Sequence, residues 1–202
     1  MVELRTISDS KKAFHLAFPY VIPPIYRRIT DELLVELNLL SHQKQFEVDR
    51  IFATGLCEVF NTFTKGYKPE AHINQLFKAI CSCNGFDSLK IESESEEAIN
   101  QAQEWGLDSI KEIINNNEQI PYSNSTNEII TGLHAPKHYS RLFTVGVLTL
   151  ISKTKSTNPT NSKEINELTL NFLEKIGLPK TKIERDLSLY NANITKLTQA
   201  IE

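Results

Sequence analysis

Cysteine, glycine and tryptophan are scarce in this sequence, and neither sign of charge dominates it. Three cysteines among 202 residues are too few for a dense disulfide framework, which indicates a reducing compartment. The seven scattered glycines form neither a phosphate-binding glycine loop nor a Gly-x-Ser-x-Gly nucleophile elbow. Lysine and arginine number 22 against 25 acidic residues, for a formal net charge of −3, so we expect no nucleic-acid binding.

Long hydrophobic runs are also missing. The longest mostly apolar stretch, residues 142–151, contains two threonines and a glycine. It is about half of the roughly 20 residues that a helix needs to cross a bilayer. The first residues lack a charged-then-apolar signal pattern, and their acidic residues argue against a transit peptide. We therefore expect neither a membrane span nor a targeting peptide.

Several segments carry apolar residues at a spacing of three or four, which is typical of helices. The pattern predicts an all-α protein, a single bundle of about eight or nine helices in one domain over residues 1–202. Within it we expect a main bundle over 23–152, a linker over 153–163 and C-terminal helices over 164–202. The individual helices are predicted at about 23–42, 48–64, 69–80, 93–105, 107–114, 139–151, 163–176 and 179–202.

Two of these predictions rest on weaker patterns. Ser93 and Glu96 match a capping box, which places a helix start at Ser93 in the most polar part of the chain. Residues 139–151 are rich in valine, threonine and leucine and would also suit a strand. A lone strand in a helical chain has no partner, so a buried helix is the better interpretation. Residues 118–137 are predicted to form a loop.

The last helix carries a regular apolar seam. Its members follow a 4-3-4-3-4 spacing for two and a half heptads: Ile183, Leu187, Tyr190, Ile194, Leu197 and Ile201. The favoured interpretation is that this long amphipathic helix packs on its own bundle. The alternative is that part of the helix projects and docks a partner helix. On that alternative the partner-binding residues are Tyr190, Ile194, Leu197 and Ile201.

Arg27 and Arg28 lie in the first turn of their predicted helix, where the helix dipole disfavours cations. Their i+4 partners, Asp31 and Glu32, follow them, and this order stabilises a helix less than acid before base. At least one of the two arginines should therefore interact outside its own helix. An interhelical ion pair is the favoured interpretation, and a partner's carboxylate or an anionic lipid headgroup is the alternative.

No residue constellation points to catalysis or to a bound metal. Cys81 and Cys83 have the wrong spacing for a Cys-x-x-Cys pair, and Cys57 is expected to pack as a small apolar residue. His134 and His138 lie at a loop-to-helix junction without a nearby carboxylate motif. We expect no enzyme activity, no metal and no cofactor. The alternative function is a small-ligand or pigment-binding helical protein with one of these histidines as axial ligand.

Five segments together resemble the thylakoid-formation family, whose members are also described as photosystem II biogenesis proteins. The similarity covers nearly the full length in order and lies in Thr6–Phe14, Ile25–Leu37, Arg50–Leu56 with Phe63–Ala71, Tyr139–Leu148 and Leu178–Tyr190. The resemblance implies an all-helical, non-enzymatic protein that associates peripherally with the thylakoid membrane. It also implies a role in photosystem II assembly and repair, and in maintaining FtsH-type membrane proteases.

Partners and location follow from the same resemblance. The expected partners are the thylakoid FtsH-type protease complex and photosystem II assembly intermediates. Because the similarity starts within the first ten residues, we expect the cyanobacterial form, on the cytoplasmic side of the thylakoid membrane. No polybasic cluster lies beside an apolar face, so attachment should run mainly through a protein partner. The sequence departs from the family pattern at residues 92–103 and 118–137.

Overall fold

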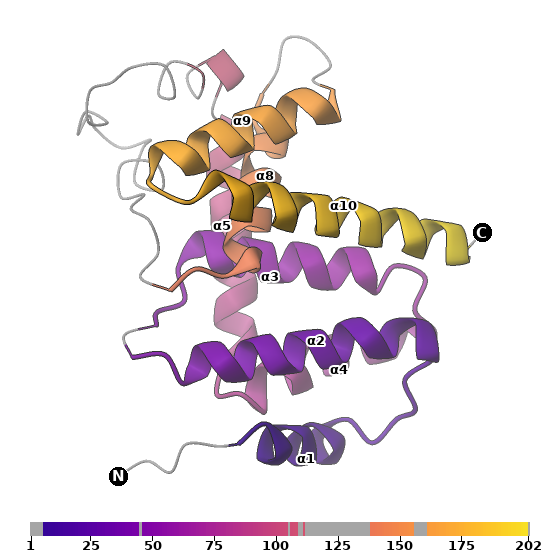
Figure 1. Cartoon of the computed structure of the whole chain (residues 1–202). Helices are drawn as coiled ribbons and strands as arrows, with labels where there is room; N and C mark the ends of the chain where they lie inside the picture. Colours follow the sequence, from indigo (N-terminus) through magenta and orange to yellow (C-terminus); the bar gives the residue numbers. More distant parts are fainter. Residues whose placement is uncertain are drawn as a thin grey trace.

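The computed structural model describes residues 6–44, 46–104, 106–108, 111, 138–155 and 161–201 (Figure 1). Within these ranges the chain forms α-helices and one short 3-10 helix, η1, and contains no strand, which confirms the predicted all-α fold. In chain order they are α1 (Ile7–Ala17), α2 (Pro24–Ser41), α3 (Arg50–Phe63), η1 (Glu70–His72), α4 (Ile73–Ser82), α5 (Ser88–Glu104), α8 (Arg141–Lys153), α9 (Ser162–Lys175) and α10 (Lys180–Ile201).

Helix α8 crosses α3 at the centre of the molecule (Figure 1). The crossing is close because two glycines meet there: a Cβ atom at Gly55 would lie 1.8 Å from the carbonyl oxygen of Leu142. In Figure 1 the axes of α2, α3 and α10 are roughly aligned, with α2 running opposite to α3 and α10, while α5 lies beside α8 across them. The helix predicted over 139–151 is therefore present as α8, shifted by two residues to Arg141–Lys153, and most of its side chains are buried.

The core has two parts. The first gathers side chains from α1 to α4 around Phe14, Phe52 and Leu56, and the second lies among α5, α8, α9 and the start of α10. Helix α10 contacts both, since Ile183 belongs to the second part and Leu197 packs against the first. Burial of such apolar side chains is the main source of stability in a bundle of this size.

Helix boundaries follow local signals in most places. The Asp49 side chain accepts from the Phe52 amide at 2.7 Å and starts α3, and Ser140 accepts from the Leu142 amide at 3.0 Å and starts α8. Gly177, at φ +92°, ends α9 in the left-handed conformation that glycine adopts without strain.

The predicted start at Ser93 is wrong. Helix α5 begins at Ser88, where the Asp87 side chain accepts from the Leu89 amide at 3.0 Å. Ser93 lies exposed in the second turn of that helix. The Ser-x-x-Glu pattern also occurs inside helices, and the earlier cap at Asp87 takes precedence. The segment predicted as a helix over 69–80 starts with the 3-10 turn η1 and ends at Ser82. The 118–137 loop, and most of the short helix expected before it, lie outside the described residues.

Candidate partner-binding surfaces

The apolar seam of α10 faces the protein's own core over the part that the structure describes. Ile183 and Leu187 are buried, and Tyr190, Ile194 and Leu197 are half-buried against the first part of the core. The favoured interpretation of the seam, packing on its own bundle, therefore describes this helix as far as Leu197. The side chain of Ile201 lies outside the described residues. A partner-binding role for these residues remains a prediction.

Tyr190 packs α10 against α3. Its ring contacts the ring of Phe63 edge-on, with centroids 6.1 Å apart. Burial raises the pKa of Tyr190 to about 12, and the neighbouring Glu58 carboxylate adds to this, while a hydrogen bond with Thr62 opposes it. The phenol is thus held in its neutral form by the same packing that holds the helix.

Arg27 and Arg28, near the start of α2, form no ion pair with another helix among the residues that the structure describes, so the expected interhelical pair is not seen there. The Nε of Arg28 pairs with Oε1 of Glu32, one turn along the same helix, at 2.9 Å. The Arg27 guanidinium donates to the carbonyl of Ile22 at 3.5 Å. The interhelical contact is made instead by Glu32, because its second oxygen lies 3.1 Å from the NH1 of Arg141 on α8.

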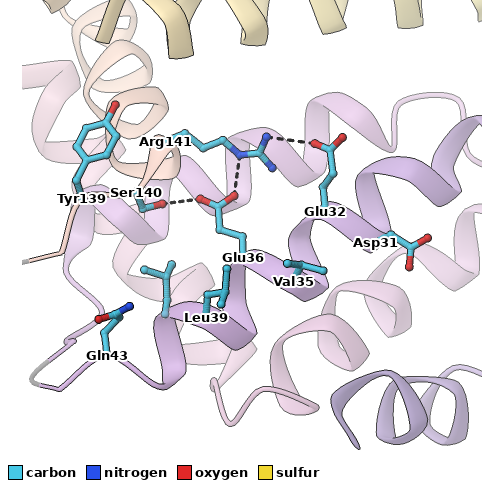
Figure 2. A pocket seen from close by; sticks show the side chains of 10 residues that line it. Asp31, Glu32, Val35, Glu36, Leu39, Gln43, Tyr139, Ser140 and Arg141 are labelled. Carbon is cyan, nitrogen blue, oxygen red and sulfur yellow. Dashed lines mark hydrogen bonds and ion pairs between the residues drawn. The ribbon is translucent and has the colours of Figure 1, made fainter. Parts of the chain in front are cut away.

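Arg141 is the centre of an ion-pair network that joins α2 to α8 (Figure 2). Its Nε lies 2.7 Å from Oε2 of Glu36, and its NH1 reaches Glu32. Ser140 donates its hydroxyl to the other oxygen of Glu36 at 2.7 Å. One guanidinium thus bridges two carboxylates one turn apart on α2, and it does so through two separate nitrogens of its planar fork of donors.

This network forms one wall of a pocket of about 590 Å³, which we call the α2–α8 pocket. Its apolar members include Val35 and Leu39, which are 38% and 59% exposed. The full lining is Asp31, Glu32, Val35, Glu36, Leu39, Leu40, Gln43, Tyr139, Ser140 and Arg141. The volume lies within the range of small-molecule sites, roughly 300–1,000 Å³. Little in the sequence indicated this pocket, because Val35 and Leu39 lie outside the row of apolar residues that α2 buries.

Tyr139 ties the wall of this pocket to α10. Its hydroxyl donates to Oδ2 of Asp186 at 2.7 Å and accepts from the Thr144 hydroxyl at 2.7 Å. The Nζ of Lys182 lies 4.0 Å from the centre of the tyrosine ring, a cation–π contact. Burial, more than any other cause, raises the pKa of Tyr139.

A second, smaller cavity of about 150 Å³ lies between α2 and α10, and we call it the α2–α10 groove. It brings together Arg28 and Leu197, which the sequence presented as unrelated candidates. Its lining is Ile25, Arg28, Ile29, Glu32, Phe63, Asn193, Lys196 and Leu197. Glu32 borders both cavities, so its two carboxylate oxygens link the arginine of the groove to the arginine of the pocket.

None of the described histidines or cysteines lines the α2–α8 pocket or the α2–α10 groove. No group of three or more His, Cys, Asp or Glu side chains in the described ranges could hold a metal ion. A ring nitrogen of His138, Nε2, lies 2.7 Å from the carbonyl oxygen of Lys44, and His134 lies outside the described residues. Burial raises the pKa of the Cys57 thiol to about 11, and it raises that of Cys81 as well, so both stay protonated near neutral pH.

The same ranges include no helix with both the length and the apolar character needed to traverse a bilayer.

The fold and the two cavities define an all-α bundle that presents charged and apolar side chains in concave surfaces between helices. The chain belongs to the thylakoid formation protein family, whose sequence model matches residues 6–202. It is 42% identical over 204 residues to Protein Thf1 of Synechococcus sp. (strain CC9605), covering 100% of this chain and 88% of that protein. It is 41% identical over 199 residues to Protein Thf1 of Prochlorococcus marinus (strain NATL1A), covering 98% of this chain and 93% of the relative.

A solved structure gives the same result for the fold. The crystal structure described as that of Psb29 at 1.55 Å superposes with a TM-score of 0.81 at 32% sequence identity. The match covers 97% of this chain and 91% of the Psb29 chain. The resemblance read from the sequence segments is thereby confirmed as family membership.

Proposed function

We propose that this protein is a non-enzymatic adaptor that supports photosystem II biogenesis and repair, and thylakoid organisation, by binding and maintaining FtsH-type thylakoid proteases. The observation that carries the proposal is the family match over residues 6–202. The helical fold shared with Psb29 supports it. The family is named for thylakoid formation, and the two cavities between helices offer concave surfaces for a partner.

In this proposal the adaptor lies peripherally on the cytoplasmic side of the thylakoid membrane, where its protein partner holds it. Photosystem II assembly intermediates are the second expected partner. Support comes from the balanced surface charge, since anionic membranes bind clusters of about 4–8 basic residues and this chain has no such cluster beside an apolar face.

The test is affinity capture with the tagged full-length chain as bait on detergent-solubilised cyanobacterial thylakoid membranes. We expect FtsH-type subunits to be enriched over a tag-only bait, as measured by quantitative mass spectrometry. A host strain lacking the gene should contain less of the protease, and re-expression should restore it. Flotation of the purified chain with anionic liposomes should fail. Capture without FtsH-type subunits would refute the proposal.

A further inference from the structure

The α2–α10 groove has an apolar floor of limited size. Ile25 is 38% exposed, and Ile29 and Leu197 are half-buried beside the buried ring of Phe63. At about 150 Å³ the groove is well below the roughly 300–1,000 Å³ of pockets that enclose a small-molecule ligand or cofactor. Its size therefore suits one apolar side chain that projects from a larger partner.

The rim of the groove is positively charged. The Arg28 side chain is 77% exposed, and its ion pair with Glu32 uses Nε, so its two terminal nitrogens form no ion pair with a described residue. Lys196 is exposed and forms no ion pair with any described residue. The one acidic residue of the lining, Glu32, has both oxygens engaged by arginines.

The position of the groove adds to this charge. Helix α2 starts at Pro24 and Ile25, where the helix dipole places a partial positive charge, and Arg28 lies one turn further along the same helix. The first turn of α2 contains no carboxylate that would offset the positive charge of the helix start. The arrangement costs local helix stability, as the sequence already indicated for these arginines, and it favours an anion at the rim.

We propose that the α2–α10 groove binds an acidic, apolar peptide segment of a protein partner: one apolar side chain enters the groove, and flanking carboxylates pair with Arg28 and Lys196. The inference deepens the proposed function, because this segment would belong to the protein that the adaptor holds. A peptide fits better than a membrane, since two cations fall short of the cluster that binds anionic lipid, and the apolar floor is concave.

The direct test uses the full chain and a fluorescein-labelled peptide that alternates Glu and Asp with Leu and Phe. One control peptide replaces the acids by Gln and Asn, and another replaces Leu and Phe by Ser. By fluorescence polarisation we expect the first peptide to bind at least about tenfold more tightly than either control. Arg28→Glu and Lys196→Glu should each weaken its binding about tenfold, and raised salt should weaken it further.

Two further variants serve as controls for the binding experiment. Arg28→Gln removes the charge without placing a second acid beside Glu32, and it should weaken binding less than the reversal does. Lys90→Glu, at an exposed position on α5 away from the groove, should bind like the unchanged chain. Equal binding of the acidic and neutral peptides, or unchanged binding after both reversals, would overturn the proposal.

The thylakoid capture separates this inference from the proposed function. If the chain carrying both reversals recovers less FtsH-type protease than the Lys90→Glu chain, the groove is the docking site. If it recovers the protease equally well, the groove assignment fails while the adaptor function stands. If the unchanged chain floats with phosphatidylglycerol vesicles and the double reversal does not, the cations bind lipid and the peptide proposal is overturned.

Discussion

Gly55 of α3 and Gly146 of α8 face each other where the two helices cross, and neither position has room for a side chain. A Cβ atom at Gly55 would lie 1.8 Å from the Leu142 carbonyl oxygen, and one at Gly146 would lie 2.0 Å from the carbonyl oxygen of Ile51. In both cases the obstacle is backbone and cannot rotate aside. The central crossing of the bundle therefore requires glycine, which has no Cβ atom, at both positions.

Replacing either glycine by alanine should force α3 and α8 apart and loosen both parts of the core. We expect Gly55→Ala and Gly146→Ala each to lower the free energy of unfolding by about 3 kcal/mol, the upper range for overpacking, despite alanine's better helix propensity. Urea titration followed by circular dichroism measures this. Asn171→Ala, at an exposed position of α9, is the matched control and should change stability by no more than about 0.5 kcal/mol. Equal stability of all three variants would contradict the close crossing.

The network around Arg141 should depend on the guanidinium fork and not on charge alone. Arg141→Lys keeps the positive charge but replaces the two separate donors, Nε and Nη1, by a single nitrogen on a flexible chain, so we expect a loss of about 1 kcal/mol in the free energy of unfolding. The figure is modest because the Arg141 side chain is 35% exposed. A double-mutant cycle with Glu36→Gln should give a coupling of similar size. A cycle with Asp31→Asn is the control, since Asp31 pairs with Lys11, and it should give no coupling.

Periodicity was sufficient to predict where most helices lie. The expected segments 23–42, 48–64 and 163–176 agree with α2, α3 and α9 to within one or two residues, because proline, glycine and polar caps punctuate them. Helix α5 was misplaced since its apolar face is thin and two cap patterns compete in its first turns. The helical state of α8 followed from the lack of a strand partner, an argument about the whole fold and not about its own residues.

The sequence indicated some residues of the candidate sites but not how they come together. The unfavourable placement of Arg28 marked it as unusual, and the seam marked Leu197, but nothing in the spacing joined them. The pairing of Glu32 with Arg141 spans 109 residues and exists only because α8 crosses α3 beside α2. Such contacts depend on tertiary packing, which a pattern within one helix does not encode.

Alkaline pH should destabilise the protein through two half-buried tyrosines, Tyr139 and Tyr190. The folded-state pKa of Tyr190 is about 12, against an ordinary value of 10.0, so the unfolded chain loses this proton first as pH rises. The contribution of Tyr190 to the free energy of unfolding is therefore fully present below pH 10. It falls by about 2 kcal/mol as the pH rises toward 12. Tyr190→Phe should flatten that fall in part, because Tyr139 contributes in the same direction. Urea titrations at several alkaline pH values measure it. Asn171→Ala, at an exposed position of α9, removes no titratable group and should leave the slope unchanged.

Removing the Tyr139 hydroxyl should weaken the attachment of α10 to the wall of the α2–α8 pocket. Asp186 is only 9% exposed, and its other partner, Arg185, lies 3.6 Å away, so Tyr139→Phe leaves the carboxylate oxygen Oδ2 buried without its phenol donor. We expect a loss of about 1–3 kcal/mol in the free energy of unfolding. Asp186→Asn keeps an acceptor for the phenol and should cost less. Amide hydrogen exchange should show faster exchange in the first turns of α10 in the phenylalanine variant, and unchanged exchange there would mean that apolar packing around Ile183 alone holds the helix.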